Sequence, residues 1–221
     1  MANDIKYEKP IPSNNLVDAK EYQNIDTAIA NAVALTNAGT TLVKEKEMAK
    51  LIAENSKDAK YIADNEIPDS EKMNIDNTLF IKSSAVIAVT HKRSEEHPDA
   101  KKRSLNQYTS QSLMNISNSY ETKAQKGDYE DFAKKREKSL NKIRARNNGI
   151  TNDEITGEPL KGSGDFHHKN KKTLFTDPAQ RLDPDKGILV NKSTHQDIHK
   201  NNINDEKSLE EYKKRYKRND K

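Results

Sequence analysis

Four of the six histidines of this chain lie close together near its C-terminal end, as the adjacent pair His167-His168 and the spaced pair His195 and His199. Two histidines four residues apart on a helix lie on one face, with Cβ atoms about 5–6 Å apart, so both imidazoles can bind one cation. A third imidazole from an upstream hairpin would complete a three-nitrogen site and leave a position open for water or substrate. The remaining histidine could then move protons near neutral pH. One metal and one adjacent base form a minimal arrangement for hydrolysis.

The surrounding sequence predicts a strand, a loop, a second strand and a helix, in the order that this chemistry needs. Residues 182–187, Leu-Asp-Pro-Asp-Lys-Gly, have strong turn chemistry, because Pro fixes φ and Gly tolerates positive φ. Residues 188–190, Ile-Leu-Val, are typical of a short buried strand. The candidates for the cap of the next helix are Asn191, Ser193 and Thr194, and those for its end are Asn201 and Asn202.

This pattern resembles the HNH (ββα-metal) endonuclease family, and most closely its nuclease-colicin branch, over roughly residues 150–202. The resemblance rests on residues 165–168 (Asp-Phe-His-His), on the turn and the apolar run just described, and on the helix start at Ser193-Thr194-His195. Residues 155–160, Ile-Thr-Gly-Glu-Pro-Leu, are also similar to the first strand and turn of many HNH domains. The resemblance covers less than a quarter of the chain.

The resemblance implies a role for each histidine. His167, His195 and His199 would bind one divalent ion, and His168 would be the general base that activates water. Asp165 or Asp197 would orient a ligand imidazole by a hydrogen bond.

One position departs from the family's pattern. The family's middle Asn, which ties down the loop that presents the base, falls at Lys186, and Asn191 is nearby but out of register. A lysine donates hydrogen bonds but accepts none. The departure predicts a slow or substrate-gated enzyme, or a protein that keeps the fold and binds nucleic acid without cutting it.

The expected cofactor is one divalent metal ion, and the expected substrate is DNA, with RNA as the alternative. Three imidazoles suit Zn, Ni, Co or Mn better than Ca, and Mg is compatible with turnover because phosphate oxygens and water complete its shell. Residues 134–146 carry seven basic residues against one acid, which suits a phosphate backbone as well as a solvated helix face. The predicted nucleic-acid contacts are Lys135, Arg136, Lys142, Arg144, Arg146 and Arg181, with Lys169, Lys171 and Lys172 as further candidates.

Composition sets the expected fold class. Only 32% of residues are hydrophobic and 33% are charged, which predicts a mainly α, partly disordered chain rather than one compact globule. The expected organisation is a helical targeting or interaction region over residues 1–148, an HNH-like module over 149–204, and a charged helical or disordered tail over 205–221.

Within the first region, apolar residues at helical spacing predict a helical hairpin interrupted at residues 37–40, and further helices over 105–120 and 129–146. The apolar stretch from Phe80 to Val89 favours a helix over a strand. Residues 91–103 are expected to form a charged loop, which would leave His91 and His97 as solvated surface residues.

The cysteine content and the hydropathy of the chain limit where in the cell the protein is expected. Because the chain has no cysteine, it has no disulfide framework. No apolar run approaches the ~20 residues of a membrane span, and the first six residues lack the apolar core of a cleavable signal. We therefore expect a cytoplasmic protein, with export by a signal-independent route left open.

Several alternatives to a nuclease are compatible with the sequence. The histidines could form a structural zinc site, although closed structural sites usually use cysteine, or could be surface residues without a ligand. The biological role could be that of a bacterial toxin, which would require an immunity partner that masks a basic cleft. It could also be that of a phage or mobile-element protein whose N-terminal helices form a targeting or assembly module. A protein partner or inhibitor could bind through these helices. The sequence does not predict the oligomeric state.

Overall fold

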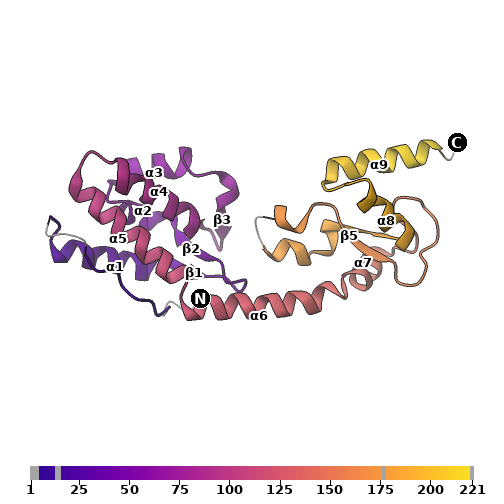
Figure 1. The fold of residues 1–221 in the computed structure, drawn as a ribbon, viewed down its shortest axis with the longest axis horizontal. Coiled ribbons are helices and arrows are strands. Elements are labelled where there is room, and N and C mark those ends of the chain that lie inside the picture. Colours follow the sequence, from indigo (N-terminus) through magenta and orange to yellow (C-terminus); the bar gives the residue numbers. More distant parts are fainter. Residues whose placement is uncertain (1–4, 13–15, 176–177, 220–221) are drawn as a thin grey trace. The chain divides into compact units, whose positions relative to one another are not determined.

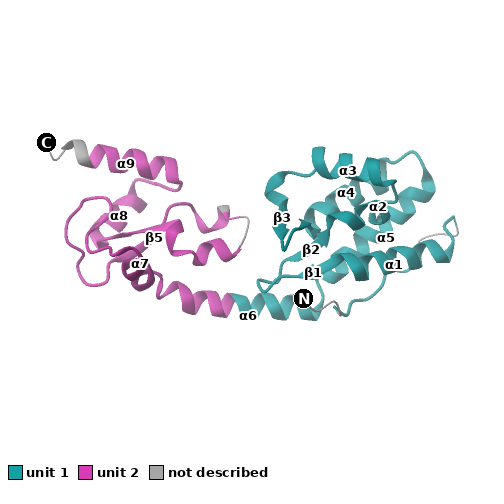
Figure 2. Cartoon of the chain, turned by 180° about the vertical axis from the view of Figure 1, so that it is seen from behind, with its two compact units in different colours: residues 1–129 teal, residues 130–221 magenta. Residues whose placement is uncertain are grey.

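The computed structural model describes residues 5–12, 16–175 and 178–219, and it is mainly α, as expected. The chain divides into two compact units, Met1–Tyr129 and Glu130–Lys221 (Figure 2). The division falls inside helix α6 (Tyr120–Glu137) rather than at the expected boundary after Asn148. It falls earlier because helix α7 (Leu140–Asn148) buries Leu140 and Arg144 within the second unit.

Unit 1 combines five helices with a four-stranded antiparallel sheet of order β1-β2-β4-β3 (Figure 1). Its helices, before α6, are α1 (Ala19–Ala32), α2 (Met48–Leu51), α3 (Ser56–Asn65), α4 (Ser83–Glu96) and α5 (Ala100–Ser117). Its strands are β1 (Val33–Leu35), β2 (Thr41–Lys44), β3 (Lys72–Ile75) and β4 (Thr78–Lys82).

The predicted helical hairpin around residues 37–40 is wrong, because these residues connect two strands. α1 ends at Ala32, and Val33 begins a strand that pairs with Val43 of β2. The turn uses Gly39 at φ 75°, a backbone conformation that glycine adopts without steric cost. The helical spacing of the apolar residues thus continued one residue past the true helix end.

Two further predictions for unit 1 are corrected. Phe80 and Ile81 lie in strand β4, and only the second half of the apolar stretch from Phe80 to Val89 is helical. Residues 91–103 are not a loop, since α4 continues to Glu96 and α5 begins after Asp99, whose carboxylate caps the helix by accepting from the Lys101 and Lys102 N–H groups. The charges of this stretch lie on helix faces.

The core of unit 1 is larger than the lean composition predicted. Twenty-two buried residues from the helices and the sheet form one hydrophobic cluster, and Leu51, Ile52, Ile81, Val86 and Leu113 are fully buried within it. The described residues of this unit are therefore packed around a continuous core, and the expected partial disorder does not apply to them.

Unit 2 contains the expected order of strand, loop, strand and helix. Strand β5 (Asp165–His168) pairs antiparallel with β6 (Gly187–Val190), and helix α8 (Lys192–Lys200) follows directly. Three short 3-10 helices lie between the strands, at Lys172–Leu174, Pro178–Leu182 and Pro184–Lys186. Helix α9 (Glu206–Asn219) ends the described chain and buries Leu209 in the core of the unit, so the described part of the predicted tail is helical; residues 220 and 221 lie outside it.

Two segments of unit 2 differ from their predictions. Residues 155–160 form no strand; the segment is a turn closed by a single bridge between Asn152 and Pro159. The predicted helix over 129–146 is interrupted between α6 and α7, where Ser139 leaves helical geometry. Among the described residues, every helix is too short or too polar to cross a lipid bilayer.

A buried carboxylate in unit 1 gathers three basic side chains. The Glu54 side chain, 7% exposed, pairs with Arg93, with Lys102 at 2.7 Å, and with Nε2 of His97 at 3.1 Å. The expectation that His97 is a solvated surface residue is therefore wrong, whereas His91 is exposed. Burial by itself raises the pKa of Glu54, but the Lys102 hydrogen bond and the charges of Arg93 and Lys102 outweigh it and lower the pKa below its ordinary value.

We predict that Glu54→Gln lowers the free energy of unfolding by about 2 kcal/mol, because three partly buried basic groups lose their ionised partner. Since the folded-state pKa is lowered, this contribution is present above the unfolded pKa of about 4.3 and is lost as the pH falls through the folded value. Urea titrations at pH 7 and pH 3 measure both effects. The control is Glu66→Gln, which removes a more exposed pair with Lys92 and should change stability little; equal losses for the two variants would contradict the prediction.

Candidate metal centre

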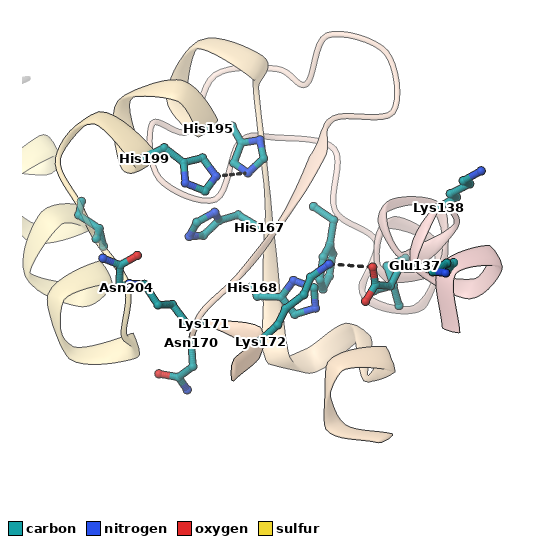
Figure 3. A pocket seen from close by; sticks show the side chains of 14 residues that line it. Glu137, Lys138, His167, His168, Asn170, Lys171, Lys172, His195, His199 and Asn204 are labelled. Atoms are coloured by element: carbon teal, nitrogen blue, oxygen red, sulfur yellow. Dashed lines mark hydrogen bonds and ion pairs between the residues drawn. The ribbon is translucent and has the colours of Figure 1, made fainter. Parts of the chain in front are cut away.

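Three imidazoles converge in unit 2, as the sequence predicted. His167, His195 and His199 each offer one ring nitrogen, and these atoms all lie within 4.8 Å of one another (Figure 3). The Nε2 atoms of His195 and His199 are 3.2 Å apart, and the ring of His167 lies 5.2 Å, centroid to centroid, from each of the other two. Among the described residues, this is the one group of histidines and carboxylates arranged to hold a metal ion.

The positions of the three rings follow from the hairpin and the helix after it. His167 pairs with Ile188 in the β5–β6 register, and Gly187 opposite His168 leaves no room for a Cβ because the Phe166 ring packs against it. α8 begins two residues after β6 and buries Thr194 and Ile198 against the unit. His195 and His199 are four residues apart on α8 and so share one side of the helix, and their rings each lie 5.2 Å from that of His167.

The spacing of the His195 and His199 nitrogens fits one first-row divalent cation. Two nitrogens bound at about 2.0–2.1 Å, with an angle between 90° and 110° at the metal, are about 2.9–3.4 Å apart. The 3.2 Å between His195 and His199 falls in this range. The His167 side chain is buried, whereas His199 is exposed, so the cluster is open on one side. An open coordination position is what distinguishes a catalytic site from a closed structural one.

Of the two carboxylates expected beside the imidazoles, one is in place. Nδ1 of His195 lies 3.3 Å from Oδ2 of Asp165, and because a carboxylate only accepts, Nδ1 carries the proton. Nε2 of His195 is then left with its lone pair toward the other two rings. Asp197 is exposed on α8 and has no hydrogen bond or ion pair with any imidazole among the described residues.

Burial keeps the innermost imidazole neutral. The pKa of His167 is lowered from 6.5 to about 4, chiefly because burial disfavours the charged ring, and also because His195 and His199 lie beside it. At neutral pH its nitrogen therefore offers a lone pair rather than a proton, which is the state that a metal ligand needs.

His168 lies on the opposite face of β5, away from the three-imidazole cluster (Figure 3). Its Nε2 is 2.8 Å from the carbonyl oxygen of Arg181, and since a carbonyl only accepts, Nε2 carries the proton and Nδ1 is the proton acceptor. The rings of Phe166 and Phe175 pack at 5.0 and 5.9 Å from the imidazole. Burial lowers the pKa of His168, although the hydrogen bond to Arg181 opposes the shift. The ring is thus a neutral base of fixed tautomer.

One cavity of about 900 Å³ contains all four imidazoles. Lysines of α6 and the turn after it, and of the segment after β5, line it, and Phe166, Leu140 and Ile203 supply apolar walls. The polar side chains that line the cavity with the histidines are Lys134, Glu137, Lys138, Asn170, Lys171, Lys172 and Asn204. The cavity therefore combines three convergent imidazoles, a fourth neutral imidazole and an excess of lysines over acidic side chains.

The predicted phosphate contacts have different environments. Lys135, Arg136, Lys142 and Arg146 are exposed, but none of them lines this cavity. Arg144 lies in a different environment, because its side chain is 8% exposed and pairs with Glu154 at 2.8 Å and Asp185 at 3.3 Å. Arg181 is also engaged, by Glu130 at 2.9 Å and Glu137 at 3.7 Å. Lys134 and Lys138 line the cavity, but their sequence context did not distinguish them from the other lysines of the stretch.

Groups other than the Lys186 side chain hold the loop next to His168. Lys186 is exposed, and its carbonyl oxygen accepts from the Lys169 N–H at 2.9 Å, which extends the β5–β6 pairing by one bond. Asn191 is buried; its Oδ1 accepts from the Lys161 N–H at 2.8 Å, and its Nδ2 donates to the Pro159 carbonyl at 3.2 Å. Asn191 begins α8 without capping it by its side chain, because that side chain is used in these two bonds.

Sequence reasoning missed two carboxylates that support the site. The buried Asp153 accepts from the Asn191 N–H at 2.7 Å, and Glu154 accepts from the Leu189 N–H at 2.6 Å. Glu154 also accepts a hydrogen bond from Nε of Arg144 at 2.9 Å. The adjacent acids Asp153-Glu154, next to a strand-like segment, were the only signal in the sequence.

Comparison of the chain with models of known families, with curated proteins and with solved structures finds no match. The chemistry of the site is therefore the basis of its functional interpretation.

We predict that His167→Ala, His195→Ala and His199→Ala each weaken binding of Zn²⁺ at least tenfold, because each removes one of three donor atoms. His168→Ala should leave the affinity nearly unchanged, since this ring lies on the other face of β5. Calorimetric titration of the four variants measures the difference. Equal losses for all four would contradict the assignment of ligands.

We also predict that Asn191→Ala lowers the free energy of unfolding by about 2 kcal/mol, because it removes the two hydrogen bonds of the buried amide to the Lys161 N–H and the Pro159 carbonyl. Lys186→Ala should change it by less than about 0.5 kcal/mol, since that side chain is exposed. Urea denaturation of the two variants provides the comparison. A larger loss for Lys186→Ala would show that the lysine side chain, and not Asn191, holds the loop.

Proposed function

We propose that residues 130–219 form a divalent-metal-dependent endonuclease of the HNH (ββα-metal) type, which hydrolyses DNA phosphodiester bonds. The observation that carries this proposal is the pairing of two groups in one cavity. Three imidazole nitrogens lie within 4.8 Å of one another, and a fourth, neutral imidazole lines the same cavity, held at Nε2 by a carbonyl so that Nδ1 is the proton acceptor.

The four histidines would divide the work of hydrolysis. His167, His195 and His199 would hold one ion of Mg, Mn, Ni or Zn, which when bound neutralises negative charge on the phosphate and the leaving oxygen. His168 would take a proton from the attacking water at Nδ1, while the Arg181 carbonyl holds the ring by Nε2. Asp165 would keep His195 in the tautomer that binds metal.

The distribution of charge supports a polyanionic substrate for unit 2. Residues 130–221 contain 22 lysines and arginines against 16 aspartates and glutamates, whereas residues 1–129 contain 17 against 19. Lys134, Lys138, Lys171 and Lys172 line the cavity that holds the histidines. We therefore assign binding of the nucleic-acid backbone to unit 2 and propose that unit 1 targets the enzyme or binds a protein partner.

A protein that binds nucleic acid without cutting it is the second candidate. It is favoured by Lys186, an exposed lysine where the HNH family has a loop-anchoring amide. In this case the three imidazoles would hold a metal that stabilises the unit, and His168 would have no catalytic consequence.

We predict that the purified chain nicks supercoiled plasmid in the presence of Mn²⁺ or Mg²⁺ and that EDTA abolishes the activity. His168→Ala should lower the rate at least a hundredfold without loss of metal affinity, because general-base catalysis contributes about 10²–10⁴. His91→Ala, which changes an exposed histidine of unit 1, is the control and should cut at the wild-type rate. Binding of DNA without any metal-dependent cleavage would instead support the second candidate.

A further inference from the structure

Two carboxylates of α6 lie beside the segment that holds the base. Glu130 and Glu137 are seven residues apart, so two helical turns bring them to the same side of α6. Oε2 of Glu130 is 2.9 Å from Nη2 of Arg181, and Oε1 of Glu137 is 3.7 Å from Nε of the same guanidinium. Oε2 of Glu137 also accepts from Nζ of Lys172 at 2.7 Å (Figure 3).

The two basic side chains belong to the turns that enclose His168. Lys172 begins the 3-10 helix Lys172–Leu174, and Phe175, directly after it, packs its ring against the imidazole. Arg181 lies in the 3-10 helix Pro178–Leu182, and its carbonyl oxygen accepts from Nε2 of His168. Ion pairs to α6 therefore anchor both of the turns that contact this ring.

We propose that Glu130 and Glu137 are positioning residues for His168, acting through Arg181 and Lys172. This inference rests on the proposed function, in which His168 is the general base. A neutral imidazole can carry its proton on either nitrogen, and a fixed carbonyl at Nε2 selects the tautomer whose Nδ1 accepts. The two glutamates hold that carbonyl in place from a neighbouring helix. Arg181 is accordingly an anchor of the base and not a contact to the phosphate backbone.

The rival interpretation of the same contacts is electrostatic. Glu137 lines a cavity rich in lysine, so its negative charge could oppose the phosphate and occupy cations that would otherwise bind it. The two interpretations predict opposite kinetics. Loss of positioning lowers kcat and leaves KM unchanged, whereas loss of an opposing charge lowers KM and leaves kcat unchanged.

The test uses the full chain with Glu130→Gln and Glu137→Gln combined, and Asp131→Asn as the matched control. Asp131 is on the same helix, is exposed, and pairs only with Lys134 at 3.5 Å among the described residues. Imidazole nitrogen NMR of ¹⁵N-histidine-labelled protein reports the tautomer of His168 directly. We expect a single Nε2–H form in the wild type and the control, and a mixture of tautomers in the double variant.

In the cleavage assay, the double variant should lose roughly tenfold in kcat, with KM and Zn²⁺ affinity within twofold of the wild type. Arg181→Met keeps the carbonyl but removes its anchor, so it should produce the same tautomer mixture and an unchanged salt dependence of binding. This single variant also serves if the double variant fails to fold.

An unchanged tautomer in both Arg181→Met and the glutamate variant would overturn the proposal, and so would a lower KM with an unchanged kcat. A wild-type chain that binds metal but never cuts would refute the proposed function. The NMR comparison does not depend on cleavage, and in that case it still decides whether the glutamates fix the base.

Discussion

The antiparallel pairing of β5 with β6 determines where all four imidazoles of the candidate site lie. Successive side chains of a strand point to opposite faces, so His167 and His168, although adjacent in sequence, lie in different environments. His167 faces α8, which follows β6 directly, and there meets two histidines one helical turn apart. His168 faces the turns that follow β5, where its Nε2 donates to a carbonyl oxygen and its ring packs against two aromatic rings. A shift of the register by one residue would exchange these roles and disrupt the site.

Polar groups, together with the apolar core, fix this small hairpin to the rest of the unit. The buried side chains of Asp153 and Asn191 bond main-chain groups at the junction of β6 and α8, and Glu154 does so at Leu189. Arg144 connects Glu154 to Asp185 and so ties α7 to the turn before β6. Such networks stabilise one arrangement strongly when every member has a partner, and they are costly when one is removed. The precision that a metal site needs is therefore supplied by charged and amide side chains.

The sequence was sufficient for the parts that depend on local periodicity. The His-x-x-x-His spacing and the adjacent pair upstream of an apolar strand predicted the three-imidazole cluster, and turn chemistry located the loop before Gly187. The supporting contacts were not predictable, because Asp153 and Asn191, or Glu137 and Arg181, are far apart in sequence and resemble ordinary surface residues. In unit 1, helical spacing extended through Val33 although that residue begins a strand, since sheet pairing overrides a one-residue propensity.

The central claim is that one divalent ion is held by three imidazoles with an open position beside a neutral base. X-ray absorption spectroscopy of the full chain with one equivalent of Zn²⁺ tests it most directly. We predict a first shell with three imidazole nitrogens at about 2.0–2.1 Å and at least one oxygen, and a loss of one imidazole in His199→Ala but not in His168→Ala. A first shell made of oxygen alone, or one that keeps all its imidazoles in His199→Ala, would contradict the account.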